Sequence, residues 1–335
     1  MTTAIRRQVA AAVLIAAAFL LAACGSGPSQ VNSALIVGST SVTVDQVQNE
    51  LNDVLATQTT SQQAQLQSKL DQASRALVRG HVLHVLLQKA TTQYGLAVTD
   101  QQVDQVISQA GGTSKAAAAL FIDPANIRDG VRDLLLEVAL ARKYADTLNV
   151  TFGYVVAKDR ATAVQDAQQI AADPTKLTGL VNAANAAAKA AGGTSGGATT
   201  TQFSISSYLQ GIAQAQQQAQ QQGQTAPTED LSPVFGAPAN SVVAFQPAAA
   251  ADPSWIVAII KTHATGAGTA PGSPSSADSS DLGTLESVGI NLLQPQASAL
   301  GVRISPRYGN WNQAGMTVTA GNDQTADVEL PVKKS

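Results

Sequence analysis

Two histidines lie close together in a helix-forming segment and could bind a metal ion. His81 and His84 are three positions apart, so a helix would place both imidazoles on one face. A structural zinc site needs four ligands, and no further ligand follows the pair at a recognisable spacing. The chain has only three histidines and one cysteine. We therefore interpret the two histidines as packed or solvent-facing side chains, and we expect no metal and no cofactor.

Carboxylates four positions apart could serve as general acid and base. Asp100 and Asp104 form one such pair, and Asp129 and Asp133 form the other. Both pairs lie in segments that contain Gln and Arg, where acidic side chains are usually solvated. Ser195 lacks the G-x-S-x-G turn of a serine nucleophile, and the glycines beside it carry no lysine for a phosphate. The sequence specifies no active site, and we expect no catalytic residue.

The single cysteine stands where its chemistry can be predicted from its neighbours. Cys24 follows a Leu-Ala-Ala run that ends the apolar stretch 9–22, and two arginines precede that stretch. A basic start, a short apolar run and small residues are typical of a secretory signal peptide, and the run is shorter than the ~20 residues that span a bilayer. Bacterial lipoprotein signals place the lipid-accepting cysteine at this point. We predict lipidation of Cys24, as in palmitate-bearing lipoproteins, with a plain signal peptide and a chance cysteine as the alternative.

Composition narrows the class of protein further. Removal of residues 1–23 would leave 312 residues with a formal charge of −5, from 18 basic and 23 acidic side chains. That length suffices for one large domain or two ordinary ones. A mildly acidic chain without a basic block argues against nucleic acid as a partner. With aromatic residues at 4 %, the core must be aliphatic, and long helices are a natural way to build it.

Periodicity and capping residues predict mainly helices in the first half of the chain. A small hairpin is expected at 34–42, and Thr43 and Thr99 each open a helix with a glutamine three positions later, the spacing of a capping box. The Gln-rich run 210–224 is either a polar helix or an insertion. Further helices are expected over 61–94, 116–121, 123–148, 161–172, 177–191, 231–235 and 282–300, and strands over 150–157, 241–243, 255–261 and 302–304.

The order of these features resembles the N-terminal domain of the SurA-type periplasmic chaperones, in the form found on lipoproteins of high-GC Gram-positive bacteria. The resemblance rests on the signal, the hairpin, the two capped helices and the Leu-Ala-Val-Thr-Asp-Gln-Gln-Val run at 96–103. The Pro-Arg-Tyr-Gly-Asn-Trp segment at 306–311 is similar to the ending of such lipoproteins. The family hairpin carries Val-Asn-Gly, whereas Gly38 here follows valine directly. These features cover roughly half of the mature chain.

The resemblance implies an α+β fold: a mainly helical chaperone module, completed by a C-terminal helix and strand, with an inserted parvulin-like α/β domain. The domain boundaries that follow are a signal peptide at 1–23, a flexible tether at 24–33, the helical domain at 34–148, the parvulin-like domain at 150–264, a linker at 265–280, the C-terminal helix and strand at 281–312, and a loose polar tail at 313–335.

The resemblance also gives a test for prolyl isomerase chemistry. Active parvulins carry a histidine on their first strand and another before their last strand. Gly153 stands at the first of these positions, and Ser254 and Trp255 stand at the second. His263 falls after the expected strand, too late for the role. The isomerase machinery is therefore expected to be lost, although a histidine-free pocket that twists the peptide bond remains an alternative.

The resemblance implies a membrane-anchored chaperone or folding factor that acts outside the cytoplasm. Its partners would be unfolded or newly exported polypeptides, with membrane lipid bound through Cys24 and no nucleic acid. Trp255, Tyr308 and Trp311 are the aromatic candidates for peptide contact. The alternatives are an active prolyl isomerase with a divergent pocket, and a ligand-binding or scaffold lipoprotein.

Overall fold

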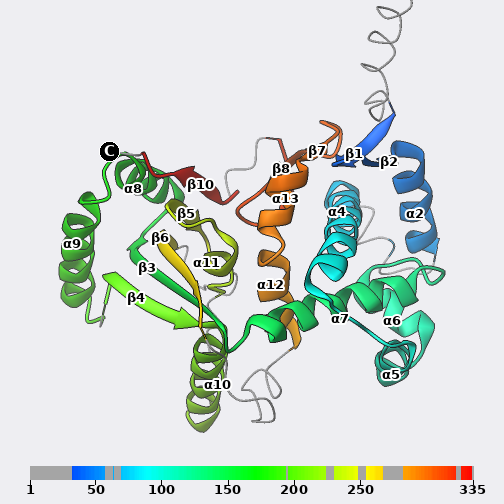
Figure 1. Cartoon of the computed structure of the whole chain (residues 1–335), viewed down its shortest axis with the longest axis horizontal. Coiled ribbons are helices and arrows are strands. Elements are labelled where there is room, and N and C mark those ends of the chain that lie inside the picture. The colour runs from blue at the N-terminus through cyan, green and yellow to red at the C-terminus, as the bar shows by residue number, and fades with distance from the viewer. Residues whose placement is uncertain are drawn as a thin grey trace, which may run out of the picture.

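A computed structural model describes most of the chain beyond the expected tether. The described residues are 32–56, 63, 69–193, 195–223, 230–247, 254–266, 282–321 and 326–333. Cys24, the expected signal peptide and most of the expected tether and linker lie outside them. Figure 1 shows two halves: a helical half formed by 32–147 and 282–321, and a sheet half formed by 148–266 and 326–333.

The helical half is built around the long helix α4 (Leu70–Tyr94). Strands β1 (Ser33–Val37) and β2 (Thr40–Thr43) form the expected antiparallel hairpin. Thr43 then caps α2 (Val44–Ala56): its hydroxyl accepts from the Gln46 amide, and its own N–H donates to the Gln46 side chain. The remaining helices of this part are α5 (Asp100–Gln109), α6 (Thr113–Leu120) and α7 (Ile127–Tyr144). The second capping box, at Thr99, opens α5 as expected.

The C-terminal segment completes this module, as the resemblance implies. Helices α12 (Leu282–Asn291) and α13 (Gln294–Leu300) pack on α7 and α4 respectively, and β7 (Val302–Ile304) pairs antiparallel with β1. One helix was expected over 282–300. Two are present because Pro295 cannot donate the backbone bond that a continuous helix needs, and it sits instead in the first turn of α13.

The sheet half contains five antiparallel strands in the order β10-β5-β6-β3-β4. Helices α8 (Arg160–Ala172) and α9 (Lys176–Ala190) cover one face, while α10 (Ile205–Gln221) and α11 (Pro233–Gly236) lie towards the other. The strands are β3 (Leu148–Ala157), β4 (Gly197–Ser204), β5 (Ser241–Phe245), β6 (Trp255–Thr265) and β10 (Val328–Pro331).

The core joins the two halves. One apolar cluster includes Leu86 of α4, Leu293 beside α13, and Phe152 and Phe245 of the sheet. A second cluster lies between the sheet and helices α8 and α9, and a small third one lies among α5, α6 and α7. The overall fold is therefore α+β, as expected.

Two details of the secondary structure differ from the sequence prediction, and one open alternative is decided. Helix α7 ends at Tyr144 rather than 148, because Leu148 already pairs with Thr265 in the sheet. The strand β4 was not expected, and it follows the glycine-rich loop directly. The Gln-rich run forms most of the helix α10, which a capping box at Ser204 opens, so the polar-helix alternative is confirmed over 210–221.

The segment 313–335 was expected to be a loose polar tail, and this prediction is also wrong. Strand β9 (Thr317–Thr319) pairs with β8 (Asn310–Asn312), and β10 joins the five-stranded sheet. Met316 is completely buried beside α4, where the Arg79 guanidinium donates to its carbonyl at 2.9 Å. Burial of these few apolar side chains orders a segment whose composition is otherwise polar.

Candidate functional site

The three aromatic candidates for peptide contact do not come together. Trp255 begins β6 and is 3 % exposed, in the cluster under α8, with the Arg160 guanidinium 5.8 Å from its ring centre. Tyr308 is 4 % exposed and packs in the main core, with Arg307 5.9 Å from its ring centre. Both rings stabilise the fold from inside, so the interpretation of Trp255 and Tyr308 as surface contacts is wrong for this conformation.

Trp311 is different, because it is half-buried and lines an open groove. Its indole N–H donates to the Gln313 side chain at 2.8 Å, which fixes the ring. The groove has a volume of about 480 Å³ and runs beside β1 and β7. Its apolar lining comes from Leu35, Ile36, Val302, Ile304, Pro306 and Trp311. An open groove with an apolar lining of this kind can hold an extended apolar segment without a specific sequence.

The two positions tested for isomerase chemistry do not face each other. Gly153 pairs with Ile259 across β3 and β6, whereas Trp255 pairs with Ala157. Four residues of strand separate the two pairs, or about 13 Å at ~3.3 Å per residue. A Cβ on Gly153 would lie 2.4 Å from the Thr199 carbonyl oxygen and 2.5 Å from Leu177 Cδ2, so no side chain fits there. His263 lies within β6 rather than after it, opposite Val150 and exposed.

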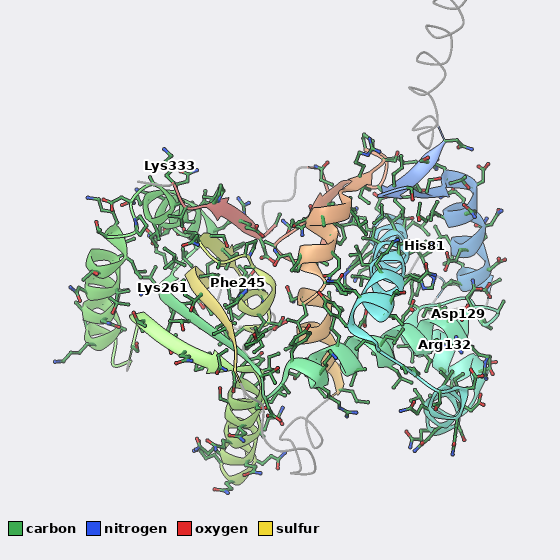
Figure 2. The ribbon with its side chains drawn as sticks, viewed as in Figure 1. His81, Asp129, Arg132, Phe245, Lys261 and Lys333 are labelled. Carbon is green, nitrogen blue, oxygen red and sulfur yellow. The ribbon has the colours of Figure 1, made fainter. Side chains whose placement is uncertain are left out.

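The histidine pair links helices of the helical half. His81 Nε2 lies 2.6 Å from a Glu50 carboxylate oxygen of α2, and His84 Nδ1 lies 2.7 Å from one of Asp133 of α7. The hydrogen bond to Asp133 raises the pKa of His84 above its ordinary value. Figure 2 shows His81 on α4 inside this half. Among the described residues no three His, Cys, Asp or Glu side chains are placed to hold one metal ion.

Three of the four carboxylates at four-residue spacing form exposed ion pairs, whereas Asp133 is 23 % exposed and bonds to His84. Arg132 donates to Asp100 at 2.7 Å and to Asp129 at 2.8 Å, and Arg128 donates to Asp104. Figure 2 labels Asp129 and Arg132 at the outer side of the helical half. Each carboxylate in this network is more than half exposed. They serve as solvated charges between α5 and α7, which agrees with the sequence interpretation.

A buried carboxylate that sequence reasoning missed lies where α7 meets α12. Glu137 is 5 % exposed, and burial raises its pKa well above the ordinary value. The negative charge of Glu286 on α12 raises this pKa further, whereas the positive charge of Arg79 on α4 lowers it. The sequence signal was a lone glutamate inside the apolar run 134–139 of a helix.

Among the described residues, no helix has the length and apolar character required to cross a bilayer.

Residues 4–127 match the SurA-like N-terminal domain. The match runs from the N-terminal apolar stretch to the first residue of α7, and it confirms the resemblance stated for this part of the chain. No curated protein sequence matches the chain. Among solved structures, the foldase protein PrsA from Lactococcus lactis is similar at 11 % identity, over 82 % of this chain and 94 % of that one, with a TM-score of 0.25.

Proposed function

We propose that this protein is a lipid-anchored chaperone that binds unfolded or newly exported polypeptides outside the cytoplasm and does not isomerise prolyl bonds. The observation that carries the proposal is the SurA-like match over 4–127, in a module that α12, α13 and β7 complete. Chaperone binding requires an accessible apolar surface rather than an acid–base pair. The groove beside Trp311 supplies such a surface on this same module.

The position of the groove supports an anchored role. Ser33, the first residue of β1, lines the groove. Ser33 is nine positions after Cys24, and an extended chain of that length spans at most about 32 Å. A lipid on Cys24 would therefore hold the groove close to the membrane surface, where exported chains emerge.

The sheet half supports the absence of isomerase activity. Gly153 is enclosed by Thr199 and Leu177, and Trp255 is enclosed under α8. The segment 150–264 contains no cysteine, and its single histidine, His263, is exposed near the end of β6, away from both positions. Stabilisation of a twisted prolyl bond needs polar groups aimed into an open pocket, and neither position opens into one.

Tryptophan fluorescence tests the proposed binding surface, because the chain has only two tryptophans and one is buried. The probe is a permanently unfolded, tryptophan-free carboxymethylated polypeptide, added to the mature chain carrying Cys24→Ser. We expect a saturable emission change that Trp311→Phe abolishes, with several-fold weaker binding of the labelled polypeptide. The control Val156→Ala, at an exposed site on β3, should bind normally. No binding by the Cys24→Ser chain would refute the chaperone function, and unchanged binding by Trp311→Phe would refute the groove.

Metabolic labelling with a fatty acid tests the anchor. The wild-type chain should incorporate label and sediment with membranes, whereas Cys24→Ala should do neither. Incorporation by Cys24→Ala, or a wild-type chain that is unlabelled and soluble, would contradict the proposed lipidation.

A further inference from the structure

The edge of strand β5 is occupied by a distant part of the same chain. Strand β10 pairs antiparallel with β5, with Val328 opposite Ala244 and Leu330 opposite Val242. Some 80 residues of sequence separate the partners, and β10 is only four residues long. Without β10, β5 would be an edge strand with unpaired backbone groups, which readily pair with another extended chain.

The contacts of β10 depend mainly on the backbone. The Arg160 guanidinium donates to the Ala326 carbonyl at 3.0 and 3.2 Å, and Asn312 donates to the Asp327 carbonyl at 2.7 Å. Beyond the strand, the Val332 N–H donates to Asn240 and the Lys333 N–H donates to Ala171 of α8, both at 2.9 Å. Figure 2 shows Lys333 beside α8. Contacts to carbonyl and amide groups do not distinguish one sequence from another.

The side chains of β10 supply a simple alternating pattern. Val328, Leu330 and Val332 pack against the cluster between the sheet and α8, and they are only partly buried. Glu329 points the other way, next to the Gln294 side chain, and burial raises the pKa of its carboxyl group. An extended segment with aliphatic residues at every second position reproduces the apolar contacts.

From this arrangement we infer that the β5 edge is a second polypeptide-binding site, which accepts extended segments with alternating aliphatic residues, and that β10 occupies it until such a segment displaces it. The inference rests on the proposed chaperone function, because it names the class of polypeptide that the chaperone would bind and the strand, β10, that would have to leave first. Strands of unfolded exported proteins have the required alternation. A four-residue strand whose side chains are only partly buried is a weak occupant, so exchange is feasible.

A peptide-binding experiment tests the inference on the complete mature chain carrying Cys24→Ser. The probe is the fluorescein-labelled peptide Ala-Asp-Val-Glu-Leu-Pro-Val-Lys, which has the sequence of residues 326–333. Leu330→Asp in the protein weakens the seating of β10 and should increase peptide affinity at least tenfold, because an intramolecular competitor acts at millimolar effective concentration. The control Gln202→Asp places the same charge on the opposite edge strand, β4, and should leave the affinity unchanged. Equal affinities of wild type and Leu330→Asp would overturn the inference.

A reversible disulfide between β5 and β10 provides the second test, and this test does not depend on the stability of Leu330→Asp. In the same Cys24→Ser background, Ala244→Cys with Val328→Cys joins two directly paired residues, and no other cysteine is present. Oxidation should lower peptide affinity at least tenfold, to the level that the groove of Trp311 retains, and reduction should restore it. Equal peptide affinity in the oxidised and reduced forms would overturn the inference. If the tryptophan assay still reports polypeptide binding in that case, the proposed chaperone function stands and only the β5 site fails.

Discussion

The two halves of the molecule differ in what surrounds the residues that could carry chemistry. In the helical half, ion pairs and hydrogen bonds join elements that are distant in sequence: His84 to Asp133, His81 to Glu50, and Arg79 to the carbonyl of Met316. In the sheet half, the positions that the resemblance assigns to catalysis are enclosed by apolar atoms and backbone. This difference is what the proposed function requires: a retained module that could hold polypeptides, and a sheet whose isomerase positions are closed.

The largest effect is expected where the C-terminal helices meet the helical half. A Cβ on Gly289 of α12 would lie 2.0 Å from the Glu137 carbonyl oxygen of α7. Gly289→Ala should therefore lower the free energy of unfolding by about 3 kcal/mol, because the two backbones must separate. In urea unfolding, the control Gly80→Ala, a helical glycine of α4 with open space around it, should instead be stabilised by about 0.5–1 kcal/mol. Similar stabilities for the two variants would contradict the close α7–α12 crossing.

The corresponding test in the sheet half is Gly153→Ala. The new methyl group would meet the Thr199 carbonyl and Leu177, and we expect a loss of about 2 kcal/mol in the same measurement. Gly179→Ala, in α9 of the same half and without close neighbours, is the matched control. If Gly153→His folded with wild-type stability, the position would be open and the argument for a closed site would fail.

The buried Glu137 should make stability depend on pH. Its pKa is raised in the folded state, so the folded protein binds this proton more tightly than the unfolded chain does. The associated stability is complete below the unfolded pKa of about 4.3 and is lost as the pH rises through the folded value. Glu137→Gln should therefore be more stable than wild type by about 1 kcal/mol at pH 8 and should show a flatter pH profile. Asp53→Asn, an exposed change on α2, should leave the slope unchanged; an identical slope for Glu137→Gln would refute the assignment.

The smallest effect concerns His84. The hydrogen bond to Asp133 raises the pKa of His84 above 6.5, so its contribution to stability is present below pH 6.5 and is lost as the pH rises through the folded value. The contribution should stay below about 1 kcal/mol, because the imidazole is more than one third exposed. In an NMR titration, Asp133→Asn should lower the pKa of His84, whereas Asp104→Asn should not move it. An unshifted His84 in Asp133→Asn would remove this link between α4 and α7.

Local signals in the sequence predicted local structure well. Both capping boxes, the hairpin and the packing of the C-terminal segment on the helical domain follow from spacing and from the resemblance, and the structure confirms them. Strand β4 was missed because its residues are mostly polar, and β10 because it has only four residues and its partner lies some 80 residues earlier. Trp255 was misjudged because only the packing of α8 on the sheet decides that its face is covered.

The candidate site was predicted only in part. Trp311 was identified from the Pro-Arg-Tyr-Gly-Asn-Trp segment, but its groove needs β1, some 270 residues earlier, to form the opposite wall. The environment of Glu137 is assembled by three helices, and its sequence alone showed only an interrupted apolar run. Such sites arise from contacts between distant segments, which residue spacing does not encode.

One refolding measurement tests the central claim most directly. A denatured exported protein whose slow refolding phase is limited by prolyl isomerisation is diluted into the mature chain carrying Cys24→Ser, and light scattering and the slow rate constant are recorded together. Our account predicts that scattering falls as the chaperone approaches a stoichiometric ratio, while the slow rate constant stays at its spontaneous value. A rate constant that rises in proportion to the added chain, or scattering that does not fall, would contradict it.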